Sequence, residues 1–317
     1  MWNEQDWDAL HIHAQRCTTQ SILQLVNNDS ERTNKMSMQL GPLYFSFARQ
    51  HYDTTAMTDL LHRLERSGIQ LQTQAMFAGE KINTSEDRPV LHTALRSNLS
   101  SASTAQQAYQ KAMDVLEQME VVIKQLKSSG VTDVISVGIG GSDLGPRLVL
   151  NALEDYAKND FRIHFLSSAD GMYLDRYMAK LNPDNTAVLL VSKSFNTQET
   201  LINGAVLKAW MNNPKKIYAI TASADKAIAF DVLPENVLPI WDWVGGRFSV
   251  WSAVSIPTGL GIGMENVKEF LSGAAAMDEH FLNTQIADNV VAWQAMTSVW
   301  NRNGLGYSNQ AIIPYDE

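Results

Sequence analysis

Short apolar runs alternate with amphipathic stretches from about residue 130 onward. The runs are rich in β-branched residues and cover residues 133–137, 161–166, 186–191, 216–221 and 237–241. Stretches with helical periodicity lie between them, over residues 144–156, 173–181 and 198–211. Continuous apolar strands separated by helices are typical of a parallel sheet buried on both faces. The pattern predicts an α/β fold with a five-stranded, doubly wound parallel sheet, whose ligand lies at the carboxyl ends of the strands.

The chain on either side of this region has helical periodicity. Apolar positions three and four residues apart predict helices over residues 57–71, which Gly68 ends or interrupts, and over residues 104–126. Later in the chain we expect a helix over residues 287–302 and one more strand over residues 309–314. The expected organisation is a helical amino-terminal segment over residues 1–125, a sheet domain over residues 126–285, and the helix and first strand of an incomplete second domain over residues 286–317.

Composition narrows the class of protein. The 317 residues are 45% hydrophobic and 19% charged, which is enough apolar material for a large core. The net charge of −9 argues against a general nucleic-acid binder, although a few focused donors can still hold a small anion. The chain shows neither the apolar stretch of a signal peptide nor a run of about 18 apolar residues that could cross a membrane. We expect a cytoplasmic protein.

Cysteine and histidine give little sign of a metal site. Cys17 is the only cysteine, which excludes an internal disulfide and a zinc site built of cysteines. His11 and His13 stand two apart in a polar stretch, where exposure is a better interpretation than metal binding. His164 lies within a predicted strand, and we expect its ring to be hydrogen-bonded in the core. We expect no bound metal.

A glycine-rich loop follows the first predicted strand. Residues 138–145 read Gly-Ile-Gly-Gly-Ser-Asp-Leu-Gly. The glycines let backbone N–H groups approach an anion at a helix N-terminus, and Ser142 adds a hydroxyl. The alternative is a plain strand-to-helix turn in which Ser142 or Asp143 caps the helix. The spacing matches neither the dinucleotide fingerprint nor the Walker loop, which disfavours a nicotinamide-dependent oxidoreductase.

Two further polar loops follow predicted strands. Residues 192–200 place Ser192, Lys193, Ser194 and Thr197 at a strand end, and hydroxyls with one cation form a suitable phosphate cradle. The alternative is an ordinary polar loop in which Thr197 caps the next helix. In the loop of residues 242–249, an arginine follows two glycines and could bind an anion or stabilise negative charge that develops during a reaction. Its alternative role is a structural ion pair with a carboxylate such as Asp242.

Together these motifs resemble the glucose-6-phosphate isomerase (phosphoglucose isomerase) family. The best marked segments are residues 137–147, 191–201 and 242–255. The resemblance continues upstream and at the end of the chain, over residues 76–83, 86–88, 90–92, 94–96 and 311–316. It therefore spans essentially the whole chain.

The resemblance implies interconversion of glucose 6-phosphate and fructose 6-phosphate through an enediolate, in glycolysis and gluconeogenesis, without a metal or organic cofactor. Members of the family have two sugar-isomerase (SIS) domains, each a parallel sheet between helices, and work as homodimers in the cytoplasm. The resemblance gives no reason to expect a nucleic-acid or membrane partner. The alternative function is a non-enzymatic SIS module that binds a sugar phosphate.

The resemblance also implies roles for individual residues. The substrate phosphate would be held by Ser142, Ser192, Lys193, Ser194 and Thr197. The backbone of Gly141 and Gly246 would contact the substrate, Arg247 would stabilise the enediolate, and Glu199 would support the active site from behind the substrate-binding residues. Ser194 stands where the family often has threonine, and Ser168, in the loop of residues 167–171, where it usually has asparagine.

The residues that complete the family's catalytic machinery are expected beyond this sequence. Members of the family continue past Asp316 into segments that carry the glutamate that removes the C2 proton, a histidine that assists ring opening, and a lysine. The sequence ends at Glu317. An aldose–ketose shift needs a base within reach of that proton. We therefore expect an amino-terminal portion of an isomerase, inactive or nearly so by itself.

Overall fold

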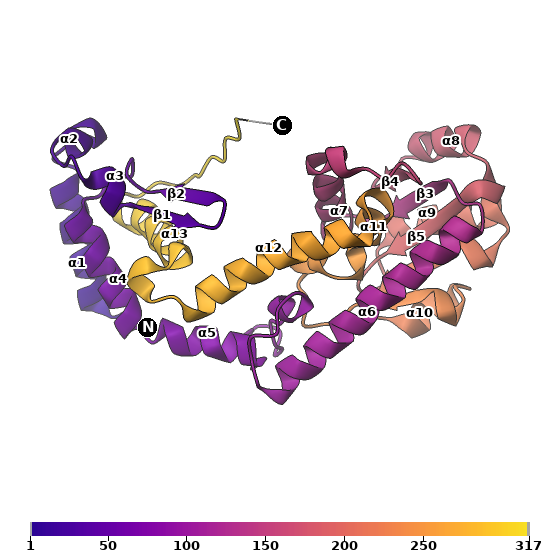
Figure 1. Cartoon of the computed structure of the whole chain (residues 1–317), viewed down its shortest axis with the longest axis horizontal. Helices are drawn as coiled ribbons and strands as arrows, with labels where there is room; N and C mark the ends of the chain where they lie inside the picture. The colour runs from indigo at the N-terminus through magenta and orange to yellow at the C-terminus, as the bar shows by residue number, and fades with distance from the viewer. Residues whose placement is uncertain (1, 316–317) are drawn as a thin grey trace. The chain divides into compact units, whose positions relative to one another are not determined.

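The structure is a computed structural model and describes residues 2–315, so that Asp316 of the last motif lies outside it. The chain forms two compact units, Met1–Gln74 with Ala276–Glu317, and Ala75–Ala275 (Figure 1). The boundaries of these two units differ from those of the three expected segments. Residues 75–125 belong with the sheet, because their long helix contributes to its core, and residues 276–285 belong with the amino-terminal unit.

The larger unit is built on a parallel sheet of five strands, as the sequence predicts. The strand order is β4-β3-β5-β6-β7, and every neighbouring pair is parallel. The predicted strands and the observed ones coincide to within two residues at each end. Their bounds are β3 (Asp133–Val137), β4 (Arg162–Leu166), β5 (Thr186–Val191), β6 (Ile217–Thr221) and β7 (Val237–Pro239).

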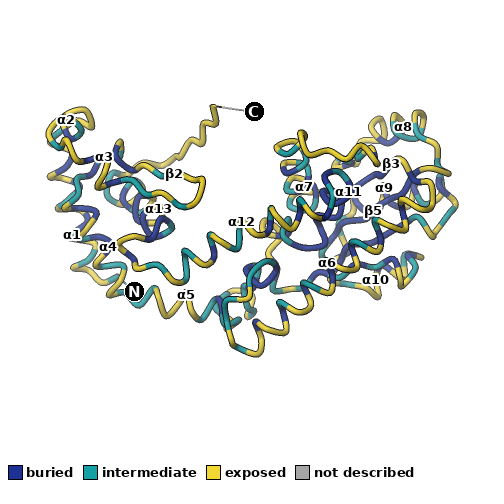
Figure 2. The backbone as a smooth tube through the Cα atoms, viewed as in Figure 1, coloured by how far each residue is buried: buried dark blue, intermediate teal, exposed yellow. Residues whose placement is uncertain are grey.

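Helices cover both faces of this sheet. Alternate side chains of the strands enter two separate cores, as Val134 and Ile135 of β3 do, and the strands are buried throughout their central part (Figure 2). One face is covered by α6 (Ser103–Ser128), α7 (Gly141–Ala152) and α11 (Ile256–Ile262). The other is covered by α8 (Gly171–Lys180), α9 (Gln198–Met211) and α10 (Ala224–Ala229).

The strand order fixes where a ligand can bind. From β3 the chain passes through α7 to β4 on one side of β3, and then crosses to β5 on its other side. The connections after β3 and β5 therefore leave the sheet on opposite faces. A crevice forms at the carboxyl ends of such a strand pair, and ligands of doubly wound sheets bind there.

Asp133 anchors the start of β3 through its polar neighbours. Its carboxylate accepts hydrogen bonds from Arg162 Nε at 2.8 Å and from Thr132 Oγ1 at 2.8 Å, and lies 2.9 Å from His164 Nε2. Burial raises the pKa of Asp133, but the hydrogen bonds from Arg162, His164 and Thr132 outweigh it and lower the pKa to about 2. His164 is thus a hydrogen-bonded residue within the strand, as expected.

The smaller unit packs helices and a hairpin around aromatic residues. Tyr52 and Trp300 are fully buried, and the Tyr52 hydroxyl shares a hydrogen bond with Thr297 at 2.9 Å. Its elements are α1 (Glu4–Cys17), α2 (Ile22–Asn27), α3 (Arg32–Lys35), β1 (Ser37–Leu40), β2 (Leu43–Ser46), α4 (Thr54–Arg66) and α13 (Val290–Val299). Helices α5 (Ile69–Ala78) and α12 (Met264–Asn283) run from one unit into the other. In this unit His13 lies 3.3 Å from Asp59, an arrangement typical of a structural ion pair.

One sequence prediction for this unit is wrong, and one of its elements was missed. Residues 309–314 form no strand, because no neighbouring strand in the described part of the chain pairs with them, and Ile312 and Ile313 are exposed. The antiparallel hairpin of β1 and β2 was not predicted. The helix predicted over residues 57–71 is divided as Gly68 suggested: its φ of +81° ends α4, and Ile69 begins α5.

Candidate functional site

A cavity of about 490 Å³ lies at the carboxyl ends of β3, β5 and β6. It brings together the glycine-rich loop, the Ser-Lys-Ser loop and the loop before Arg247. The residues that line it are Arg88, Ile139, Gly141, Ser142, Val191, Ser192, Lys193, Ser194, Thr197, Ala222, Ser223, Asp242 and Gly246. All five residues expected to hold a phosphate are among them, and so are both glycines expected to contact a substrate.

The glycine-rich loop presents Ser142 to the cavity. The loop turns through Gly140, whose φ is +61°, and α7 begins at Gly141 without a side-chain cap. Ser142 and Asp143 therefore do not cap this helix, contrary to the alternative interpretation. Asp143 instead pairs with Arg147 at 2.8 Å, one turn along the helix. Ser142 lines the cavity.

The glycine-rich loop is packed directly against the arginine loop. A Cβ atom added to Gly141 would lie only 2.0 Å from the carbonyl oxygen of Gly246. The Ser249 hydroxyl also lies between the two loops, 2.7 Å from the Gly246 carbonyl oxygen and 3.3 Å from that of Gly141. The absence of a side chain at Gly141 thus lets two backbone segments meet at one wall of the cavity, whereas a Cβ at Gly246 would meet nothing within 4 Å.

The Ser-Lys-Ser loop is fixed by a buried aromatic residue and by paired hydroxyls. Phe195 has a φ of +49° and is 2% exposed, which anchors the loop in the core below the cavity. Ser192 Oγ and Thr197 Oγ1 share a hydrogen bond at 3.1 Å. Thr197 precedes α9 but makes no side-chain cap, so the capping alternative is not observed. Two neighbouring hydroxyls of this kind can donate to the oxygens of a phosphate group.

Lys193 connects the Ser-Lys-Ser loop to the loop that follows β7. Its Nζ donates to the backbone oxygens of Asp242 at 3.0 Å and Val244 at 2.8 Å. Because an ammonium group has three N–H donors, one remains for a ligand. Burial lowers the pKa of Lys193, the charge of Arg88 lowers it further, and the nearby carboxylate of Asp242 opposes both effects. The cavity thus contains two cations and one carboxylate.

Two expected site residues do not line the cavity. Arg247 lies next to Gly246 in the 3₁₀ segment Gly246–Trp251 and is exposed, and Glu199 is exposed in the first turn of α9. In the described part of the chain, Asp242 forms ion pairs with Arg88 at 3.8 Å and with Lys193 at 3.9 Å, but not with Arg247. The alternative in which Arg247 pairs with Asp242 is therefore wrong.

The cavity also contains residues to which the sequence analysis gave no role. Arg88 and Ser223 are the polar examples. Arg88 stands in a segment that resembles the family, but nothing in its local sequence connects it to the strand ends. Ser223 stands two residues after the end of β6, so its position at a strand end was the signal that could have revealed it.

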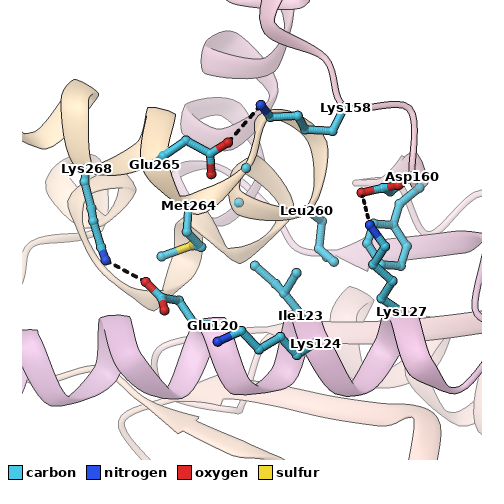
Figure 3. A pocket seen from close by; sticks show the side chains of 13 residues that line it. Glu120, Ile123, Lys124, Lys127, Lys158, Asp160, Leu260, Met264, Glu265 and Lys268 are labelled. Atoms are coloured by element: carbon cyan, nitrogen blue, oxygen red, sulfur yellow. Dashed lines mark hydrogen bonds and ion pairs between the residues drawn. The ribbon is translucent and has the colours of Figure 1, made fainter.

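A second hollow has the wrong charge balance for an anion site. It lies between α6 and the residues around the start of α12, with four lysines around an apolar base (Figure 3). Three of these lysines are neutralised by ion pairs. The pairs are Lys127–Asp160 at 2.8 Å, Lys158–Glu265 at 2.8 Å and Lys268–Glu120 at 2.6 Å. Only Lys124 has no ion pair among the described residues, so the cavity at the strand ends is the better anion site.

The described residues contain neither a cluster suited to a metal ion nor a helix suited to a membrane span. Over residues 2–315, no group of three or more His, Cys, Asp or Glu residues could hold a metal ion. In the same range, no helix is long and apolar enough to cross a membrane.

Comparisons with known proteins identify the family of the chain. Residues 46–317 match the profile of the family described as phosphoglucose isomerase. The chain is 46% identical over 312 residues to the glucose-6-phosphate isomerase of Xanthomonas euvesicatoria, covering 98% of this chain and 62% of the relative. It is also 46% identical to that of Xanthomonas campestris, covering 63% of the relative. The chain thus spans less than two thirds of the length of these curated relatives.

Solved structures show the same fold. A glucose-6-phosphate isomerase from Chlamydia trachomatis superposes with a TM-score of 0.85 at 28% identity, over 94% of this chain and 60% of that one. A hypothetical protein from Thermus thermophilus shares the fold alone, with a TM-score of 0.56 at 21% identity over 78% of this chain. The profile match over residues 46–317, the identity over nearly the whole chain and the shared fold lead to one conclusion. The chain belongs to the phosphoglucose isomerase family.

Proposed function

We propose that residues 1–317 supply the phosphate-binding half of an active site that interconverts glucose 6-phosphate and fructose 6-phosphate through an enediolate. The observation that carries the proposal is the convergence of Ser142, Ser192, Lys193, Ser194 and Thr197 on one cavity at the carboxyl ends of the strands. Hydroxyl donors with one ammonium group suit the oxygens of a phosphate monoester. The names of the relatives support the choice of sugar phosphate.

The sugar would extend from the phosphate toward the two glycine loops. Gly141 and Gly246 line the cavity, and their backbone offers donors and acceptors where side chains would block the approach. Arg247 follows Gly246 and is exposed. We assign it the stabilisation of the enediolate oxygen, since a guanidinium placed where negative charge develops lowers the barrier most. Glu199 is assigned a supporting role behind the residues that touch the substrate.

The proposal includes low activity for this chain assayed alone. Among the described residues that line the cavity, Asp242 is the only carboxylate and no histidine is present. Asp242 is 79% exposed and already forms ion pairs with Arg88 at 3.8 Å and Lys193 at 3.9 Å, so we do not assign it the removal of the C2 proton. The base, the ring-opening histidine and the lysine are assigned to the segments with which family members continue. Homodimer formation by the whole protein is part of the same proposal.

The test pairs binding with turnover on the purified 317-residue chain, freed of host isomerase. Calorimetric titration with glucose 6-phosphate should show saturable binding that Ser192→Ala and Thr197→Val weaken by about tenfold each. A coupled assay from fructose 6-phosphate should show turnover at or near background. Binding without turnover supports the proposal.

Three other outcomes would contradict parts of it. Turnover that Glu199→Gln abolishes would mean that a base lies within residues 1–317, and the assignment of the base to later segments would be wrong. Absence of any glucose 6-phosphate binding by a folded chain would contradict the phosphate-binding half itself. If extending the chain to the full length of its relatives gave binding but no turnover, a non-enzymatic SIS module would replace the isomerase.

A further inference from the structure

Arg88 reaches the anion cavity from a part of the chain that lies outside the sheet. It belongs to a short turn closed by an antiparallel bridge with Asn83, in which each backbone N–H donates to the other residue's carbonyl oxygen at 3.3 Å. The turn places the Arg88 side chain in the lining of the cavity together with Lys193, Ser192 and Ser142. The side chain is 29% exposed, so it is partly shielded from solvent yet open to the cavity.

The guanidinium of Arg88 is held along one edge only. Nε donates to Glu86 Oε2 at 3.0 Å, and Nη2 pairs with Glu86 Oε1. Glu86 is itself fixed by Asn83 Nδ2 at 2.8 Å. Nη1 makes no hydrogen bond among the described residues, and its contact is a long ion pair of 3.8 Å with Asp242. A guanidinium oriented in this way keeps two N–H donors for an oxygen ligand.

The geometry points to Arg88 as a second cation of the phosphate site, whose Nη1 donates directly to the phosphate of the substrate. This inference rests on the proposed function, because it adds a binding residue to the same site. The phosphate oxygen takes the place of the long contact between Arg88 and Asp242. Arg88 is thereby a binding residue that touches the ligand, in addition to the hydroxyls and Lys193.

The charges around the cavity agree with this role. Burial lowers the pKa of Lys193, and the positive charge of Arg88 lowers it further, because the two cations of the cavity repel each other. The carboxylates of Glu86 and Asp242 offset part of this repulsion. A phosphate monoester carries nearly two negative charges at pH 7. A bound phosphate offsets the repulsion between Arg88 and Lys193, and the two cations together attract it more strongly than Lys193 alone would.

The test measures phosphate affinity in two variants that break the same ion pair with opposite changes of charge. Arg88→Gln removes the cation, and Glu86→Gln removes its partner but leaves the cation in place. The 317-residue chain and both variants are titrated by calorimetry at pH 7.5 and low salt, once with inorganic phosphate and once with glucose 6-phosphate. Thermal unfolding of each variant confirms that it is folded, and Arg88→Lys serves as the charge-preserving control.

We expect Arg88→Gln to weaken both ligands by about tenfold, since a charge-assisted hydrogen bond is lost. Arg88→Lys should recover part of the affinity. Glu86→Gln keeps an amide oxygen that can accept from Arg88 Nε but removes a competing negative charge, so it should tighten binding by about twofold. A purely structural role for the Arg88–Glu86 pair would weaken binding in both glutamine variants. That outcome, or unchanged affinity in Arg88→Gln, overturns the inference.

The two ligands separate failure of this inference from failure of the proposed function. If inorganic phosphate binds and responds to the variants as expected but glucose 6-phosphate binds no better than phosphate, the sugar specificity is wrong and the role of Arg88 stands. If glucose 6-phosphate binds well and Arg88→Gln has no effect, only the inference about Arg88 is wrong. If neither ligand binds the folded chain, the cavity is not an anion site and both are wrong.

Discussion

The contact between Gly141 and Gly246 gives the sharpest prediction about the site. In Gly141→Ala, the new Cβ would lie 2.0 Å from the Gly246 carbonyl oxygen and 2.7 Å from its carbonyl carbon. Real Cβ atoms essentially never approach another heavy atom closer than 3.0 Å, so the two loops must separate by about 1 Å. Both partners are backbone atoms, and no rotation of a side chain can relieve the overlap.

The expected magnitude follows from this displacement. Forced overpacking of a closely packed contact lowers the free energy of unfolding by about 1–3 kcal/mol. The displacement also moves Gly246 and the adjoining Arg247 relative to the phosphate-binding loops. A misplacement of about 1 Å can reduce the effectiveness of a positioned site by roughly a hundredfold. We therefore expect lower thermal stability and a larger loss of glucose 6-phosphate affinity than the loss of one hydroxyl causes.

Gly171→Ala is the matched control. Gly171 also begins a helix after a strand of the same sheet, it is exposed, and a Cβ there would meet nothing within 4 Å. Since alanine is the better helix former, this variant should be neutral or slightly stabilised, by up to about 1 kcal/mol. The measurements are thermal unfolding and calorimetric titration of both variants. A Gly141→Ala protein with the stability and affinity of the parent would refute the argument from close backbone contact.

Three further predictions concern the sheet and the loops around it. Leu189 is fully buried in β5, so Leu189→Ala should lower the free energy of unfolding by about 2–5 kcal/mol in denaturant titration. Leu148 is 68% exposed, and Leu148→Ala should change the free energy of unfolding by less than about 0.5 kcal/mol. The pKa of Asp133 is lowered to about 2 in the folded protein, so the ionised carboxylate should contribute about 2 kcal/mol to the free energy of unfolding above pH 4 and lose this contribution as the pH falls toward 2. Asp133→Asn should flatten this part of the plot of stability against pH. An unchanged plot would contradict the lowered pKa of Asp133. Lys193→Met removes the donor that connects the Ser-Lys-Ser loop to two backbone oxygens after β7. Amide hydrogen exchange should therefore accelerate over residues 242–247 and remain unchanged in β6. Equal protection of residues 242–247 in the parent and the variant would argue against this connection.

Much of the larger unit could be predicted from the sequence because its signals are local. A strand buried on both faces must be apolar throughout, which is why the runs ending in Val137 and Val191 revealed β3 and β5 to the residue. Helix α9 was also predicted with its observed bounds, because helical periodicity is likewise a local signal. In the smaller unit, by contrast, each strand of the hairpin is four residues long and partly exposed, so no pattern distinguishes it from its helical neighbours.

The strand predicted over residues 309–314 was wrong because apolar sequence is not sufficient for a strand. Backbone hydrogen bonds of a strand require a neighbour, and none is present in the described part of the chain. The same limit applied to the polar loops. Their residue types predicted an anion site, but the choice between binding and helix capping for Ser142 and Thr197 depended on where their side chains point.

The sequence by itself determined the sheet, its flanking helices and the three loops that carry the phosphate-binding residues. These features depend on periodicity and on residue types within about ten positions of one another. Only the tertiary structure decided which distant segments share the cavity. It placed Arg88 beside Lys193, more than 100 residues later in the chain, and Gly141 against Gly246. The reason is physical: strand order and crossover geometry bring the strand ends together, and neither is encoded in any local stretch of the chain.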